Sequence, residues 1–158
     1  MTDPTDDEVI NMLHAWTRSL TPQLANFIQG LGTLEPEIRP LIAEHIEDYD
    51  EMLPSLLMGD IARWATRTAR DSTTPATRLG PFLQRLEDNW GDGQNPVSDL
   101  IATSFVENIY DEPGVVQLLG PKLTRYQRIY TGQETVRPDE KRPMPSVMKQ
   151  ILDKLGRS

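Results

Sequence analysis

The sequence predicts an all-α protein, an irregular bundle of about seven to nine short helices packed in antiparallel pairs. Three observations favour this fold class. Apolar residues recur every three or four positions along most of the chain. No segment keeps the two-residue alternation that marks a half-buried strand. Several of the 13 prolines follow a residue that can cap a helix, at the position where the first turn tolerates proline.

A capping box marks the start of the first helix. The hydroxyl of Thr5 is placed to accept a hydrogen bond from the backbone N–H of Glu8, and the Glu8 side chain reaches back to Thr5. Apolar residues then follow at helical spacing from Val9 to Leu20. The sequence therefore predicts a helix over about residues 6–20.

Proline opens most of the later helices, because the first helical position needs no N–H donor. The prolines expected to start a helix are Pro22, Pro54, Pro75, Pro96, Pro113 and Pro121. Gly30 and Gly32 are expected to end the helix that begins at Pro22. One more helix, with Ile46 and Tyr49 on its buried side, is expected to become regular near Pro40, because an interior proline costs about 3 kcal/mol.

Two glycine–proline pairs interrupt this pattern. Gly80-Pro81 is expected to kink or split the helix that begins at Pro75. Residues 79–85 and 119–125 both contain Leu-Gly-Pro and end in arginine, at a spacing of 40 residues. Because that spacing suits a two-helix repeat, short helical-repeat character stays open beside an irregular bundle.

Charge and proline content divide the chain. Residues 1–121 hold 20 of the 24 acidic residues and 7 of the 16 basic ones, whereas residues 122–158 hold 4 acidic and 9 basic residues. The expected organisation is an acidic helical domain over residues 1–131 and a proline-rich linker over residues 132–145. A C-terminal amphipathic helix over residues 146–158 is expected to pack on the body or on a partner.

Composition argues against several classes of protein. No apolar run approaches the ~20 residues that cross a bilayer, and the first residues lack the positive and apolar parts of a secretory signal. The chain has no Cys, which fits a reducing compartment. A net charge of −8 repels nucleic acid and attracts basic partners. The alternative is that the charge only keeps the protein soluble. We therefore expect a cytoplasmic protein that binds neither nucleic acid nor membranes.

Residues suited to catalysis are scarce. The two histidines, His14 and His45, have no second histidine at metal-binding spacing. The sequence also lacks the Gly-x-Ser-x-Gly nucleophile motif and a phosphate-binding glycine loop. We therefore expect no enzymatic activity, no metal and no cofactor. An enzyme that uses paired carboxylates alone stays as a minor alternative.

Acidic residues are densest between Glu44 and Glu51, where five of eight residues are acidic. In a helix, four of these carboxylates share one surface strip, and their mutual repulsion would be relieved by a basic partner. A strip that is merely solvated is the alternative. Asp60 is the next candidate, although pairing with Arg63 one turn away is its expected structural role. The candidate partner-binding residues are Glu44, Glu47, Asp48, Glu51 and Asp60.

The helix that begins at Pro54 carries two further features. Trp64 lies on the apolar side of this helix and is expected in the core. If the edge of its ring were exposed, it would serve as a binding anchor. Arg63, Arg67 and Arg70 recur at helical spacing on another face of the same helix. The sequence assigns no functional role to these arginines.

Two segments carry a resemblance to known proteins. Leu-Pro-Ser-Leu-Leu-Met-Gly-Asp-Ile-Ala-Arg-Trp (53–64) and Asp-Leu-Ile-Ala-Thr-Ser-Phe-Val-Glu-Asn-Ile (99–109) resemble segments of small acidic helical bacterial proteins. Those proteins are similar to the immunity proteins of polymorphic and contact-dependent toxin systems, which bind a cognate toxin domain and block it. The resemblance spans these two stretches in the middle of the chain and brings no catalytic signature with it.

Two functional hypotheses follow from these observations. The resemblance implies a protective binding role, which makes an immunity or antitoxin-like inhibitor of a basic toxin the leading hypothesis. The alternative is a self-assembling scaffold or an oligomeric component of a bacterial or phage defence system. In that case the basic C-terminal segment would dock on the acidic body of a neighbouring copy.

Overall fold

The computed structural model describes residues 6–136, and over this range every regular element is a helix. The all-α fold class is therefore confirmed. A five-residue π-helix, η1 (Ala102–Val106), joins α6 to α7. The α-helices are α1 (Asp6–Trp16), α2 (Pro22–Leu34), α3 (Arg39–Tyr49), α4 (Pro54–Asp71), α5 (Pro75–Asn89), α6 (Pro96–Ile101), α7 (Glu107–Ile109), α8 (Pro113–Val116) and α9 (Pro121–Tyr130).

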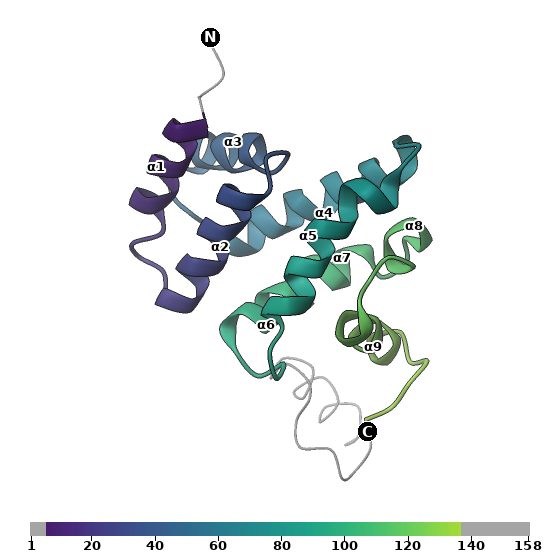
Figure 1. The fold of residues 1–158 in the computed structure, drawn as a ribbon. Helices are drawn as coiled ribbons and strands as arrows, with labels where there is room; N and C mark the ends of the chain where they lie inside the picture. The colour runs from purple at the N-terminus through teal and green to yellow at the C-terminus, as the bar shows by residue number, and fades with distance from the viewer. Residues whose placement is uncertain (1–5, 137–158) are drawn as a thin grey trace.

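Helix α4 is the centre of the bundle. It is the longest helix, with 18 residues, and it contacts α3, α5, α6, η1, α7 and α8. Figure 1 shows α1 and α2 lying side by side in opposite directions, and α4 and α5 doing the same. The short connections within these pairs produce the antiparallel packing that the sequence predicts.

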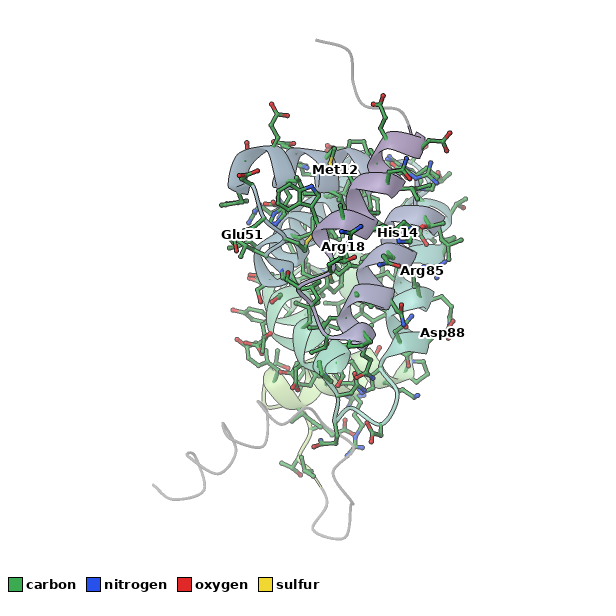
Figure 2. All side chains as sticks on the ribbon, turned by 90° about the vertical axis from the view of Figure 1, so that its left-hand side faces the viewer. Met12, His14, Arg18, Glu51, Arg85 and Asp88 are labelled. Carbon is green, nitrogen blue, oxygen red and sulfur yellow. The ribbon has the colours of Figure 1, made fainter. Side chains whose placement is uncertain are left out.

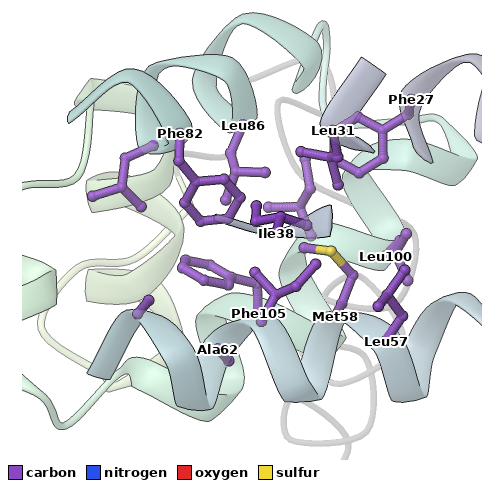
Figure 3. Packing of buried hydrophobic residues seen from close by; sticks show 14 of the residues in the cluster. Phe27, Leu31, Ile38, Leu57, Met58, Ala62, Phe82, Leu86, Leu100 and Phe105 are labelled. Atoms are coloured by element: carbon purple, nitrogen blue, oxygen red, sulfur yellow. The ribbon is translucent and has the colours of Figure 1, made fainter. Parts of the chain in front are cut away.

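The buried face of α4 packs against aromatic residues from other helices. The ring of Phe82 on α5 meets Trp64 and Phe105 edge-to-face, at centroid distances of 5.4 and 5.5 Å. Figure 3 shows Phe82 and Phe105 in the core above Met58 and other residues of α4. Trp64 is buried, as predicted, so its ring is not available as an exposed binding anchor.

The helix starts follow the sequence closely. Each of the six prolines predicted to open a helix is the first residue of one. The side chain of Thr21 accepts a hydrogen bond from the N–H of Leu24, which caps α2. Asn95 and Ser98 exchange side-chain and backbone hydrogen bonds of 2.9 and 3.1 Å, which form a capping box at the start of α6.

The predicted ends of the first two helices are wrong. Helix α1 ends at Trp16, and the Thr17 hydroxyl donates to the carbonyl of Leu13 at 2.6 Å instead of the helix continuing to residue 20. Helix α2 passes through Gly30 and Gly32 and ends at Leu34. A Cβ at Gly32 would collide with the Leu13 side chain, so this glycine allows α1 and α2 to approach closely.

Of the two outcomes predicted for Gly80-Pro81, a kink or a split of the helix, the split does not occur. Helix α5 runs without interruption from Pro75 to Asn89, and Pro81 lies inside it with an exposed side chain. Residues 119–125 instead span the start of α9. The two similar heptapeptides therefore occupy unlike positions, one inside a helix and one at a helix start, and they do not mark a repeated unit.

The described chain ends shortly after α9. Residues 132–136 follow that helix as a turn and bend with no further regular structure. The rest of the predicted linker, the C-terminal helix predicted over residues 146–158 and the Thr5 end of the first capping box lie outside the described residues. Within residues 6–136, no helix combines the length and apolar character needed to cross a lipid bilayer.

Candidate protein-binding site

The candidate residues lie around the junction of α3 and α4. We call Glu44, Glu47, Asp48 and Glu51 the acidic strip. All four side chains are exposed. Within the part of the chain that the structure describes, none of them makes an ion pair or a side-chain hydrogen bond. Their carboxylates are therefore open to solvent and to a partner.

The acidic strip follows the C-terminal end of α3 and the turn after it. Asp50 adopts the left-handed conformation, with φ 54° and ψ 23°, and its N–H closes the helix on the carbonyl of Ile46 at 2.8 Å. Glu51 therefore lies beyond the helix, and only the other three members share a helical face. Figure 2 shows Glu51 on the side of the molecule where α1 lies.

The position of Tyr49 corrects the prediction that it faces the core. Its side chain is 46% exposed, whereas His45, one turn earlier, is buried. The two rings pack at a centroid distance of 4.9 Å. Because the chain turns at Asp50, the next buried position is taken by Met52. Tyr49 is thereby left on the surface beside the acidic strip.

His45 is a structural residue beneath this surface. Its Nε2 accepts a hydrogen bond from the backbone N–H of Leu53 at 2.9 Å, which ties α3 to the start of α4. Its Nδ1 is buried and has no hydrogen-bond partner in the structure. Burial lowers the pKa of His45, and the carboxylates of Asp60 and Asp48 offset that shift only in part. His45 is therefore neutral at neutral pH.

Asp60 on α4 meets part of the acidic strip across a small cavity of about 200 Å³. Glu44, Asp48 and Asp60 line this cavity together with Arg63 and Arg67. The predicted ion pair of Asp60 with Arg63 is present. The structure thus brings three of the five candidate carboxylates together, while Glu47 and Glu51 do not line the cavity.

Exposed apolar side chains near the strip were not identified from the sequence. Besides Tyr49, Leu56 in the first turn of α4 is 47% exposed. Leu56 precedes the fully buried Leu57 and Met58 and lies on the side of α4 that carries Asp60, one turn later. Because adjacent apolar residues of this helix are also buried in pairs, the sequence carried no signal for the exposure of Leu56.

The two segments on which the expected resemblance to immunity proteins rests pack against each other. Residues 53–64 begin α4, and residues 99–109 include η1 and α7, which both contact α4. Most of their apolar residues are buried. The residues behind that expectation therefore lie mainly in the core of the bundle and do not include the acidic strip.

The described residues offer no metal-binding cluster. Over residues 6–136, no three His, Asp or Glu side chains are grouped so that they could hold a metal ion. No protein-family model, curated protein or solved structure matches the chain. Function is therefore inferred from the chemistry of the surface around α3 and α4.

Proposed function

We propose that this chain is a non-catalytic protein-binding module of the immunity type, which binds a cognate bacterial toxin with a basic surface and blocks it in the cytoplasm. The acidic strip carries this proposal. Its carboxylates repel one another, and Glu47 and Asp48 lie in the last turn of α3, at the negative end of the helix dipole. Both effects are unfavourable in the isolated protein, and a basic partner surface reverses both.

Charge complementarity suits such a partner. A toxin that acts on nucleic acid needs a basic surface for phosphates, and a chain with net charge −8 attracts that surface over a Debye length. Opposite potentials mainly raise the rate of association. The exposed side chains of Tyr49 and Leu56 supply apolar contacts that slow dissociation.

The test compares two variants of equal charge. In the first, the acidic strip is neutralised by Glu→Gln and Asp→Asn substitutions, which changes the net charge from −8 to −4. The matched control neutralises four exposed acidic residues elsewhere, namely Asp7, Asp71, Asp88 and Asp111. Wild type and control are expected to capture the same basic protein from a lysate of the source organism, and the strip variant to bind it about tenfold more weakly or worse.

The captured protein must also behave as a toxin. Expressed alone in a bacterial host, it is expected to arrest growth, and co-expression of this chain is expected to restore growth. Equal affinity of the strip variant and the control would remove the acidic strip from the proposal. A captured protein that is harmless when expressed alone would remove the immunity role.

Native mass separates this function from the alternative of a self-assembling scaffold or oligomeric defence component. The immunity function predicts a complex that contains a second, basic protein. The scaffold predicts a stable homo-oligomer with no second protein, which dissociates when residues 132–158 are deleted. That result would favour self-assembly over toxin binding.

A further inference from the structure

Three arginines of α4 line a second cavity, with a volume of about 320 Å³. Arg63, Arg67 and Arg70 follow one another at spacings of four and three residues, so they share one face of the helix. Gly59 and Ala62 also line this cavity. They leave space in it because Gly59 has no side chain and Ala62 has only a methyl group. Asn108 and Glu112, at and after the end of α7, complete the lining on the other side.

Two of these arginines are held by carboxylates and one is not. Arg63 pairs with Asp60, and Nη2 of Arg70 donates to Oε1 of Glu112 at 2.7 Å. Arg67, between them, makes no ion pair or hydrogen bond with any described residue. Its guanidinium therefore keeps all five N–H donors available to a ligand.

This local positive charge stands out in an acidic protein. Residues 6–136 contain 20 acidic and 10 basic residues. The cavity lining nevertheless contains three arginines and a single carboxylate, that of Glu112. Because Asp60 pairs with Arg63 and Glu112 pairs with Arg70, the guanidinium of Arg67 is the one positive charge of this lining that no carboxylate compensates. A site of this kind concentrates anions against the overall repulsion of the molecule.

We propose that this cavity binds a small organic phosphomonoester. A phosphomonoester carries a charge between −1.5 and −2 at neutral pH. It pairs with Arg67 and competes with Asp60 and Glu112 for the guanidinium groups of Arg63 and Arg70 on either side. Guanidinium groups bind pairs of phosphate oxygens through parallel N–H donors. The volume is at the lower end of that of ligand pockets and exceeds the volume of a phosphate group, so an organic part fits against Gly59 and Ala62.

Asn108 offers one more polar contact. Its Nδ2 donates to the carbonyl of Ser104 at 2.8 Å, which fixes the orientation of the amide and leaves Oδ1 as an acceptor. A hydroxyl group on the organic part of the ligand would satisfy that acceptor. This cavity adjoins the one that Glu44 and Asp48 line, because Arg63 and Arg67 line both. The proposal goes beyond the proposed toxin binding and is tested separately, with a small phosphate probe.

Phenyl phosphate is a suitable probe, and its affinity is measured by calorimetry at an ionic strength of about 0.15 M, where non-specific attraction is screened. The wild-type protein is expected to bind one molecule saturably. Arg67→Gln is expected to weaken binding by about tenfold or more. The matched control is Arg18→Gln (Figure 2), which replaces an exposed arginine in the turn after α1 that makes no ion pair or hydrogen bond with any described residue, and it is expected to leave the affinity unchanged.

Gly59→Leu tests the cavity without changing its charge. A Cβ at Gly59 would meet only Nη1 of Arg63, at 4.0 Å, and the substitution removes a glycine from a helix interior, so folding is preserved. The larger side chain fills the space beside the arginines. Binding of phenyl phosphate is expected to weaken at least as much as in Arg67→Gln.

Four results would overturn the proposal. The first is the absence of saturable binding to the wild type, and the second is an equal loss of affinity in Arg18→Gln and Arg67→Gln. The third is benzoate binding as tightly as phenyl phosphate, which would contradict the phosphate class. The fourth is a single-stranded oligonucleotide binding through Arg67 while phenyl phosphate does not bind, which would make the surface a nucleic-acid site.

Discussion

The carboxylate of Glu87 on α5 caps the first turn of α9, where its Oε1 accepts a hydrogen bond from the backbone N–H of Lys122 at 2.6 Å. Its Oε2 accepts a second hydrogen bond from the N–H of Leu123 at 3.2 Å. These N–H groups have no partner within the helix, and the negative charge lies at the positive end of the helix dipole. Glu87 is 6% exposed, so water cannot easily replace it.

Glu87→Ala is therefore expected to destabilise the protein by about 2–3 kcal/mol, because two buried donors lose a charged acceptor. Glu87→Gln is expected to cost less, since its amide oxygen still accepts one hydrogen bond. Urea unfolding followed by circular dichroism measures both values. The neighbouring Asp88→Ala removes an exposed carboxylate as a control and is expected to change stability by about 0.5 kcal/mol or less.

Gly120 provides a steric test of the same contact. A Cβ at Gly120 would lie 2.6 Å from Cδ of Glu87, so Gly120→Ala must displace the capping carboxylate. We expect a loss of about 1–3 kcal/mol in the free energy of unfolding. Gly30→Ala has open space around its Cβ inside α2 and is expected to stabilise by about 0.5–1 kcal/mol. Effects of the same sign in both variants would contradict the steric explanation.

His45 is expected to make stability fall at mildly acidic pH. Its pKa is lower in the folded protein than the usual 6.5, so the unfolded chain binds a proton that the folded protein does not. This contribution to the free energy of unfolding is complete above pH 6.5 and is lost as the pH falls toward the folded pKa. Protonation of Nε2 would also remove the acceptor for the N–H of Leu53.

The measurement compares unfolding free energies at pH 7.5 and pH 5.5. His45→Gln keeps a side-chain acceptor and does not titrate, so its loss of stability between these pH values is expected to be smaller than that of the wild type. His14→Gln replaces the exposed histidine of α1 and is expected to keep the wild-type dependence. Identical pH dependence in His45→Gln and the wild type would show that His45 does not contribute.

Tyr126 and Glu107 form a second partly buried contact, in which the tyrosine hydroxyl donates to Oε2 of Glu107 at 2.9 Å. Burial raises the pKa of Glu107, and this hydrogen bond offsets part of the shift. Tyr126→Phe leaves the carboxylate without this donor and is expected to cost about 1–2 kcal/mol at pH 8. The cost is expected to shrink as the pH falls toward the raised pKa of Glu107, because a protonated Glu107 needs the donor less. A cost that grows as the pH falls would contradict this assignment.

The exposed apolar residues beside the acidic strip are expected to affect binding and not folding. Tyr49→Ser and Leu56→Ser should change the free energy of unfolding by about 0.5 kcal/mol, as for other surface substitutions. Each is expected to weaken the binding of the proposed partner by about tenfold. Leu34→Ser, at the end of α2, is the matched control because Leu34 is 55% exposed and lies outside the strip. An equal loss in the control would point to a general effect of surface hydrophobicity.

Features that depend on a few neighbouring residues were predictable from the sequence. The prolines that start helices, the Thr21 cap and the pairing of Asp60 with Arg63 all involve groups no more than four residues apart. The exposed carboxylates at Glu44 and Glu47 follow from helical spacing in the same way. The cavity beside Arg67 could not be predicted from the sequence in this way, because Asn108 of α7 and Glu112 after it form one of its walls.

Helix ends and the choice of buried residue were decided by contacts between segments distant in the chain. The glycine at position 32 continues α2 because Leu13 of α1 packs against it. His45 is buried and Tyr49 is not, although both lie on one side of α3. The sequence by itself determined the all-α class and the helix starts, since hydrogen bonds within one turn suffice for them. Only the tertiary structure decided the Glu87 cap on α9 and the arginine cavity, because those groups meet only when separate helices pack together.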